Sequence, residues 1–285
     1  MGLAAAFAFV AEQMILLGHR ALTIDTNSRN IGRFARYCER GLGLETVDQI
    51  TPEVVRAFVY APSAQNKPPP PATMHGRRTA VRLAFRILIQ FGLHDSDPTR
   101  FIELPPRSEM RARPLTEDEN ELVRWASLAT LIETRQPAIV ALAEASAVSS
   151  EIPLVTAPDV DLDQATVVLA GCHTAEPRLG HLSEWGVLQI ARRIRSLDDP
   201  TVPLVYAGER GVVSGQASVA GTLSGVLTRS GLATEADVGV SSIRNRAGLV
   251  AYQSRYRIED AALVLGARGL DTAAALIGLH WQERP

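Results

Sequence analysis

Hydrophobic residues recur at helical spacing over most of the chain. In 75–92, for example, Val81, Ala84 and Leu88 lie three or four residues apart, as on the buried face of an amphipathic helix. Similar patterns predict further helices over 22–40, 51–60, 117–131, 135–147, 183–196, 213–231, 241–253, 258–266 and 270–278. The apolar start GLAAAFAFV is interrupted by Glu12, is too short to span a bilayer and lacks a signal peptide's basic start. We therefore expect an amphipathic helix there and no membrane partner.

A β-rich interlude, about 152–182, interrupts the helical patterns, and Thr166-Val167-Val168-Leu169 alternates in polarity as a strand does. The proline-containing segment 94–114 is typical of an irregular linker, and four consecutive prolines in 64–76 favour an extended stretch. After the linker, Thr116 followed by three acids is typical of a helix start. The sequence predicts a helical domain over 1–110 and a mainly helical domain with a small β-sheet over 111–285.

Charge is distributed unevenly about this boundary. Residues 1–113 carry a net charge of +5 and residues 114–285 a net charge of −7. The basic half favours a polyanionic partner, although two differently charged solvated surfaces explain it equally well. Within 75–92, four arginines lie off the apolar face and form either a solvated stripe or a phosphate-contacting one: Arg77, Arg78, Arg82 and Arg86.

The composition of the chain limits which ligands and cofactors we expect. The chain is 46% hydrophobic and 21% charged, as expected of a globular protein, and its two cysteines fit a reducing cytoplasm without disulfides. Cys172, His173 and His181 lie close together but match no zinc-binding spacing. The glycines of 207–225 are more typical of close helix packing than of a nucleotide-binding loop, since no P-loop lysine accompanies them. We expect no metal and no cofactor.

The order of these elements is specific enough to name a family. A helical domain, a proline-containing linker, the phrase RARPLTEDE (111–119), a turn ending in Glu151, a β-hairpin and further helices together resemble the tyrosine recombinases (phage integrases). The resemblance covers nearly the whole chain. It implies a core-binding domain and a catalytic-type domain that clamp double-stranded DNA. It also implies a catalytic set of two arginines, a lysine, two histidine- or tryptophan-type positions and a tyrosine nucleophile. The guanidinium groups stabilise the phosphate charge and the tyrosine forms a covalent intermediate.

Position by position, most of that set is missing. The first arginine precedes a glutamate by three residues; ASAVSSE (145–151) keeps Glu151, for which we expect a structural role, but has Val148 in place of the arginine. The lysine belongs in the hairpin near Cys172, yet Lys67 is the only lysine of the chain. His173 or Arg178 could stand in for it; the alternative is a solvated hairpin tip.

Later positions continue the trend. The second arginine is retained as Arg244, while the histidine three residues before it has become Ser241. The next histidine is Ala267, and the tyrosine should fall at about Leu276. The last tyrosine, Tyr256, comes too early in the chain to replace it. Arg244 could hold a DNA phosphate or pair with an acid such as Glu151.

The resemblance therefore implies a catalytically degenerate recombinase that binds DNA without cleaving it, as a regulator or accessory factor. In the second half, four arginines are the candidate DNA contacts: Arg192, Arg193, Arg244 and Arg246. The tail GLHWQERP, with Trp281, is a candidate for self-association. An acidic second domain that no longer engages DNA would instead indicate a protein-interaction or scaffold module. An active recombinase with unorthodox residues is the remaining alternative.

Overall fold

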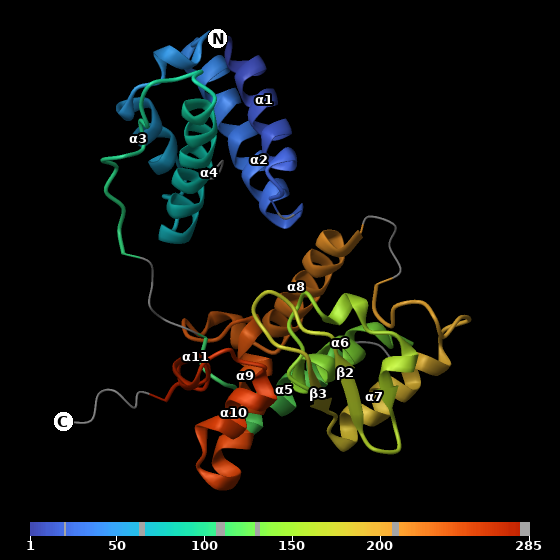
Figure 1. The fold of residues 1–285 in the computed structure, drawn as a ribbon. Helices are drawn as coiled ribbons and strands as arrows, with labels where there is room; N and C mark the ends of the chain where they lie inside the picture. Colours follow the sequence, from blue (N-terminus) through green and yellow to red (C-terminus); the bar gives the residue numbers. More distant parts are fainter. Residues whose placement is uncertain (20, 63–65, 107–111, 129–131, 207–210, 280–285) are drawn as a thin grey trace, which may run out of the picture. The chain divides into compact units, whose positions relative to one another are not determined.

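The computed structural model describes residues 1–285 except for 20, 63–65, 107–111, 129–131, 207–210 and 280–285. The chain divides into two compact units, Met1–Glu109 and Met110–Pro285 (Figure 1). Residues 280–285 of the tail predicted to self-associate, including Trp281, lie outside the described residues.

The first unit is a helical domain (Figure 1). Its helices are α1 (Leu3–Leu16), α2 (Ala21–Arg36), which continues into a π-helical turn (Tyr37–Gly41), α3 (Pro52–Tyr60) and α4 (Pro71–Gln90). Phe34, Phe58 and Phe85 are at most 5% exposed and lie in its core. Helix α4 begins four residues before the predicted start, inside the proline run, because proline suits the first turn of a helix, where no backbone donor is needed.

The second unit is mainly helical with a small sheet, which confirms the predicted fold class (Figure 1). Its helices are α5 (Glu117–Ser127), α6 (Arg135–Glu144), α7 (Glu184–Arg195), α8 (Gly211–Arg229), α9 (Val240–Arg255), α10 (Ile258–Leu265) and α11 (Leu270–Leu276). Strands β1 (Val160–Asp161), β2 (Thr166–Leu169) and β3 (Arg178–His181) pair antiparallel in that order.

Helix α6 is the centre of the second unit. Every residue from Pro137 to Ala143 is buried, and the helix contacts α5, α7, α8 and α9. A helix that is apolar on all sides is stable only when neighbours surround it. Strand β3 approaches the end of α6 so closely that a Cβ atom on Gly180 would lie 2.4 Å from the carbonyl oxygen of Ala145. The sheet is therefore held against the C-terminal end of the central helix.

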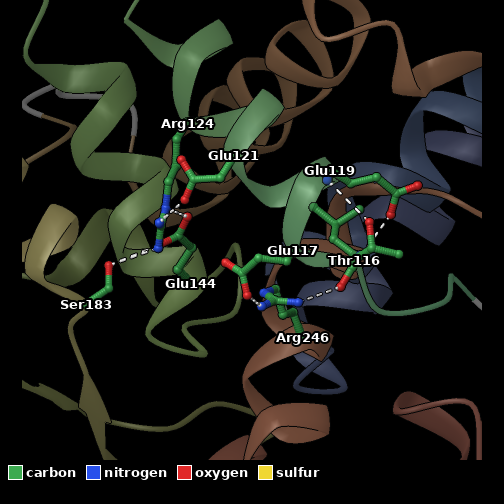
Figure 2. Close-up of polar contacts among 9 residues, drawn as sticks. Thr116, Glu117, Glu119, Glu121, Arg124, Glu144, Ser183 and Arg246 are labelled. Carbon is green, nitrogen blue, oxygen red and sulfur yellow. Dashed lines mark hydrogen bonds and ion pairs between the residues drawn. The ribbon is translucent and has the colours of Figure 1, made fainter.

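A buried polar network joins three of these helices. Arg124 of α5 donates from Nε and Nη2 to the two carboxylate oxygens of Glu144 on α6, at 2.8 Å each, and from Nη2 to Oγ of Ser183, the residue that caps α7 (Figure 2). The Arg124 guanidinium also lies 5.3 Å from the ring centroid of Trp185. The side chain of Glu144 is only 8% exposed, so the bidentate pair offsets the cost of burying its charge.

The start of α5 is fixed by its own side chains. Thr116 and Glu119 form a capping box, in which each side chain accepts from the other's backbone N–H (Figure 2). Arg113 donates to both oxygens of Glu119, at 2.7 and 2.6 Å, and to Asp237 at 3.1 Å. The hydrogen bond from Arg113 is the main cause that lowers the pKa of Glu119 to about 2.

The depressed pKa predicts how stability depends on pH. The ordinary carboxyl pKa is 4.5 and the folded value about 2, so the stability that Glu119 contributes is present above pH 4.5 and lost as the pH falls towards 2. Glu119→Gln should lower the free energy of unfolding at pH 7 by roughly 2–3 kcal/mol, and the difference from the wild type should vanish near pH 2. Urea unfolding at several pH values measures this.

Asp118→Asn is the matched control, because Asp118 is exposed in the same helical turn. It should alter the pH profile much less. A Glu119→Gln difference that stays constant from pH 7 to pH 2 would contradict the assignment.

Candidate functional site

The chain reverses sharply at the end of α6, at the turn where the resemblance places catalytic residues. Ser146 is fully buried and has a positive φ of 74°, a backbone conformation that non-glycine residues rarely adopt. Its hydroxyl donates to the carbonyl of Val264 at 2.7 Å. Its own carbonyl oxygen accepts from Nη2 of Arg178 at 2.5 Å and from Nε of Arg244 at 3.3 Å. Two guanidinium groups therefore meet at one backbone oxygen.

Arg178, the first residue of β3, is the more deeply placed of the two. Its side chain is 3% exposed. It donates to both carboxylate oxygens of Glu151, at 2.9 Å each, to the Ser146 hydroxyl at 3.1 Å and to the Glu176 carbonyl at 3.0 Å. The expectation of a solvated hairpin tip is thus wrong for Arg178, because the strand carries its side chain inward. It is correct for His173, which is exposed.

Glu151 has the structural role expected of it. Its side chain is 2% exposed and accepts from the backbone N–H of Val148 at 2.7 Å, in addition to the two bonds from Arg178. Of the two alternatives for Arg244, a pair with this acid is not what the described residues show: the ion pair of Glu151 is with Arg178.

Arg244, on the first turns of α9, is half-buried above this pair. Nη2 donates to the carbonyl of Leu265 at 2.7 Å, at the end of α10. Burial, and then the charge of Arg178, lower the pKa of Arg244 to about 10, while Glu151 and Cys172 act in the opposite direction. The guanidinium remains cationic at neutral pH and retains the capacity to bind an anion, because two carbonyls occupy only part of its five donors.

The remaining catalytic-type positions carry small, apolar or uncharged side chains. Val148 is half-buried, and Ser241 is exposed one turn before Arg244. Burial acts to raise the pKa of Cys172, but hydrogen bonds from Thr174 and Ser150 outweigh it, so the pKa lies below its ordinary value. Ala267 and Leu276 pack beside one apolar cluster that contains Ala261, Leu265 and Ile277.

The α4 arginines do not form a free stripe. Arg77 donates to three carbonyls at the end of α3, of Phe58, Val59 and Ala61, at 3.0, 3.1 and 2.6 Å. Arg78 donates to the carbonyl of Ile102 at 2.7 Å, and Arg82 to the hydroxyl and carbonyl of Thr99 at 2.9 and 3.0 Å. Arg86 alone of the four is exposed. The solvated-face interpretation is wrong for the first three, because the end of α3 provides acceptors for Arg77 and the chain after α4 provides them for Arg78 and Arg82. Their contact with phosphate stays a prediction.

The arginines predicted in the second unit are also partly engaged. Arg192 donates to Gln189 at 2.7 Å, and Arg193 donates to the carbonyl of Leu204 and to Oγ1 of Thr134. Burial is the main cause that lowers the pKa of Arg193. Arg246 donates to the carbonyl of Leu115 at 3.1 Å and pairs with Glu117 (Figure 2). Their contact with DNA stays a prediction as well.

Helix α2 presents the basic row that the sequence analysis missed. Arg33, Arg36 and Arg40 are spaced by three and four residues along α2 and its π-helical extension, and all three are exposed. No described residue forms a hydrogen bond or ion pair with any of them, whereas Arg29 on the same helix pairs with Asp25. The signal was present in the sequence as basic residues at helical spacing.

Within the described residues, no group of three or more His, Cys, Asp or Glu side chains could hold a metal ion. In the same part of the chain, no helix has the length and hydrophobicity needed to cross a membrane.

Comparison with known proteins identifies the fold. No protein-family model matches the chain, and no curated protein matches its sequence. Among solved structures, a lambda integrase dimer bound to a COC′ core site matches with a TM-score of 0.72 and 16% identity, over 100% of this chain and 79% of that one. The Tn1549 transposon integrase in complex with transposon right end DNA matches with a TM-score of 0.62 and 14% identity, over 97% and 94%. The chain thus has the fold of the tyrosine recombinases.

The buried pair at the centre of the site predicts a large effect on stability. Arg178→Ala leaves the Glu151 carboxylate buried without its partner and should lower the free energy of unfolding by about 3–5 kcal/mol. Chemical denaturation of the whole chain measures this.

Arg268→Ala provides the matched control. Arg268 pairs with Glu176, but the two side chains are 60% and 54% exposed, so the loss should cost at most about 1 kcal/mol. Equal effects of the two substitutions would show that the Arg178–Glu151 pair does not stabilise the fold.

Proposed function

We propose that the chain is a cytoplasmic protein that binds double-stranded DNA without cleaving it, as a regulator or accessory factor. The observation that carries the DNA-binding part is the row of Arg33, Arg36 and Arg40 on α2. Three exposed guanidinium groups on one helix, without partners among the described residues, suit successive contacts to a phosphate backbone. Contacts of this kind bind DNA of any sequence.

The chemistry of the catalytic-type positions supports binding without cleavage. A covalent phosphotyrosine intermediate requires a hydroxyl nucleophile. Leu276 at the tyrosine position and Val148 at the first arginine position offer neither a nucleophile nor a cation. The nearby Arg178 donates its hydrogen bonds to Glu151 and Ser146, so few of its N–H groups remain to bind the phosphate of a cleaved DNA strand.

The structural relatives support the same class of partner. The lambda integrase and Tn1549 integrase structures are complexes with DNA, and one lambda integrase tetramer is bound to a Holliday junction. That tetramer matches this chain with a TM-score of 0.71 at 16% identity, over 100% of this chain and 80% of that one. Self-association of the present chain through its C-terminal tail is part of the proposal.

The alternative is a protein-interaction module whose second unit no longer binds DNA. It rests on the net charge of −7 over residues 114–285. Under that alternative, duplex affinity would reside in the first unit alone or be absent.

Replacement of Arg33 and Arg36 by alanine tests the DNA-binding proposal. Each lost phosphate contact reduces the magnitude of the slope of log affinity against log salt by about 0.9. The slope of the double variant should therefore be smaller in magnitude by about 1.8, and the variant should bind all duplexes more weakly. Fluorescence anisotropy with random-sequence duplex DNA, over a range of salt concentrations, measures both quantities.

Arg29→Ala is the matched control, because Arg29 lies on the same helix but is already paired with Asp25. Its slope should stay close to that of the wild type. An unchanged slope in the double variant would remove α2 from the DNA interface, and no duplex binding at any salt concentration would favour the protein-interaction alternative.

A further inference from the structure

The segment that follows α4 is fixed in place by side chains of α3 and α4. Because these contacts hold the backbone, the segment is ordered before any ligand arrives. Tyr60 Oη donates to the Glu103 carbonyl at 3.0 Å, and Arg78 donates to the Ile102 carbonyl at 2.7 Å. Arg82 donates to the Thr99 carbonyl at 3.0 Å, and His75 Nε2 lies 2.9 Å from the Pro105 carbonyl oxygen. Arg78 and Arg82 of α4 thus hold this segment on the surface of the first unit.

That surface contains a pocket of about 520 Å³. Among the described residues it is lined by Arg56, Tyr60, Phe101 and Glu103. Arg56 and Tyr60 lie four residues apart on α3 and therefore share one face of the helix. Phe101 and Glu103 flank Ile102, which is 4% exposed, so the two point away from the core together. The pocket is open to solvent.

The lining combines flat aromatic surface with separate donors and acceptors. Phe101 is 80% exposed and Tyr60 is 41% exposed. The guanidinium of Arg100 lies 5.4 Å from the Phe101 ring centroid and adds a cation to the aromatic surface. No described residue forms a hydrogen bond or ion pair with the Arg56 guanidinium or the Glu103 carboxylate. The pocket therefore offers a ring to stack on, a planar donor and a planar acceptor.

We propose that this pocket binds the guanine base of an unpaired nucleotide. Bases stack on exposed aromatic side chains, and arginine donates in bidentate fashion to the O6 and N7 acceptors of guanine. A carboxylate complements the remaining edge, where the N1–H and N2–H groups of guanine both donate. Adenine presents an acceptor at N1, which a carboxylate repels. We therefore expect a pocket lined by both Arg56 and Glu103 to select guanine over adenine.

The site is separate from the proposed duplex contacts, because none of its lining residues belongs to the α2 row. Two sources of the base share this chemistry: a free guanine nucleotide and an unpaired guanine within a single strand. The inference goes beyond duplex binding and does not depend on it.

Binding by the full chain tests the proposal. The probes are a fluorescein-labelled thymidine octamer with one central guanine, the same octamer with one central adenine, and GMP and AMP as competitors. The guanine octamer should bind more tightly than the adenine octamer, or GMP should bind more tightly than AMP. Competition by GMP identifies the free nucleotide as a ligand, and a guanine preference confined to the octamer identifies the single strand. Equal binding of guanine and adenine in both forms, or no binding of either, overturns the proposal.

Two variants separate stacking from base selection. Phe101→Ala should weaken the guanine ligand about tenfold through loss of the stack. Glu103→Gln should abolish the preference for guanine over adenine while the chain still binds. Trp125→Ala is the control for loss of an exposed aromatic residue, since Trp125 is 72% exposed in the second unit, and it should change neither quantity. Thermal melting verifies that each variant is folded.

Wild-type affinity in Phe101→Ala, or an intact guanine preference in Glu103→Gln, would overturn the assignment of the pocket. Duplex binding is measured in parallel with the same protein. A chain that binds duplex DNA without any guanine preference contradicts only the pocket. A chain that binds guanine without duplex DNA contradicts only the proposed function.

Discussion

The buried pair between Arg178 and Glu151 determines how the centre of the second unit is built. Both side chains are almost fully buried, at 3% and 2% exposed, so neither charge is tolerable without the other. Through Ser146 the same arginine joins the end of α6 to the sheet, and Arg244 joins that turn to the ends of α9 and α10. The turn after α6 thus meets β3 and α9 at one carbonyl oxygen and one carboxylate, and Arg244 extends the network to the end of α10.

The helices and the small sheet could be predicted from sequence, because apolar residues recur every three to four positions in a helix and every second position in a strand with one buried face. The predicted start of α4 is four residues too late, because a proline run is compatible both with an extended stretch and with the first turn of a helix. Within the site, Glu151 and Arg244 were identified through the resemblance to the motifs of the tyrosine recombinases. The partner of Glu151 was not found, because a strand's inward and outward faces depend on the register with which the hairpin packs on α6.

Arginines illustrate the same limit. Sequence shows that Arg77, Arg78 and Arg82 lie off the apolar face of α4. It does not show that the end of α3 and the segment after α4 supply carbonyl acceptors for them. The basic row of α2 and its π-helical extension has a similar sequence signal, but no described residue forms a hydrogen bond or ion pair with it. Helical spacing identifies a basic face, and only the tertiary contacts decide whether the charges are available to a ligand. For this fold, availability rather than number of arginines separates structural residues from DNA-contact candidates.

We propose that this chain, which has a recombinase fold, binds DNA without carrying out the recombinase reaction. The most direct measurement is incubation of the full chain with nicked suicide duplexes that it binds, followed by denaturation and separation of protein-bound DNA. The account predicts duplex binding under native conditions and no DNA attached to the protein after denaturation, because Leu276 stands where a tyrosine would form the covalent bond. A denaturation-resistant protein–DNA adduct would contradict it.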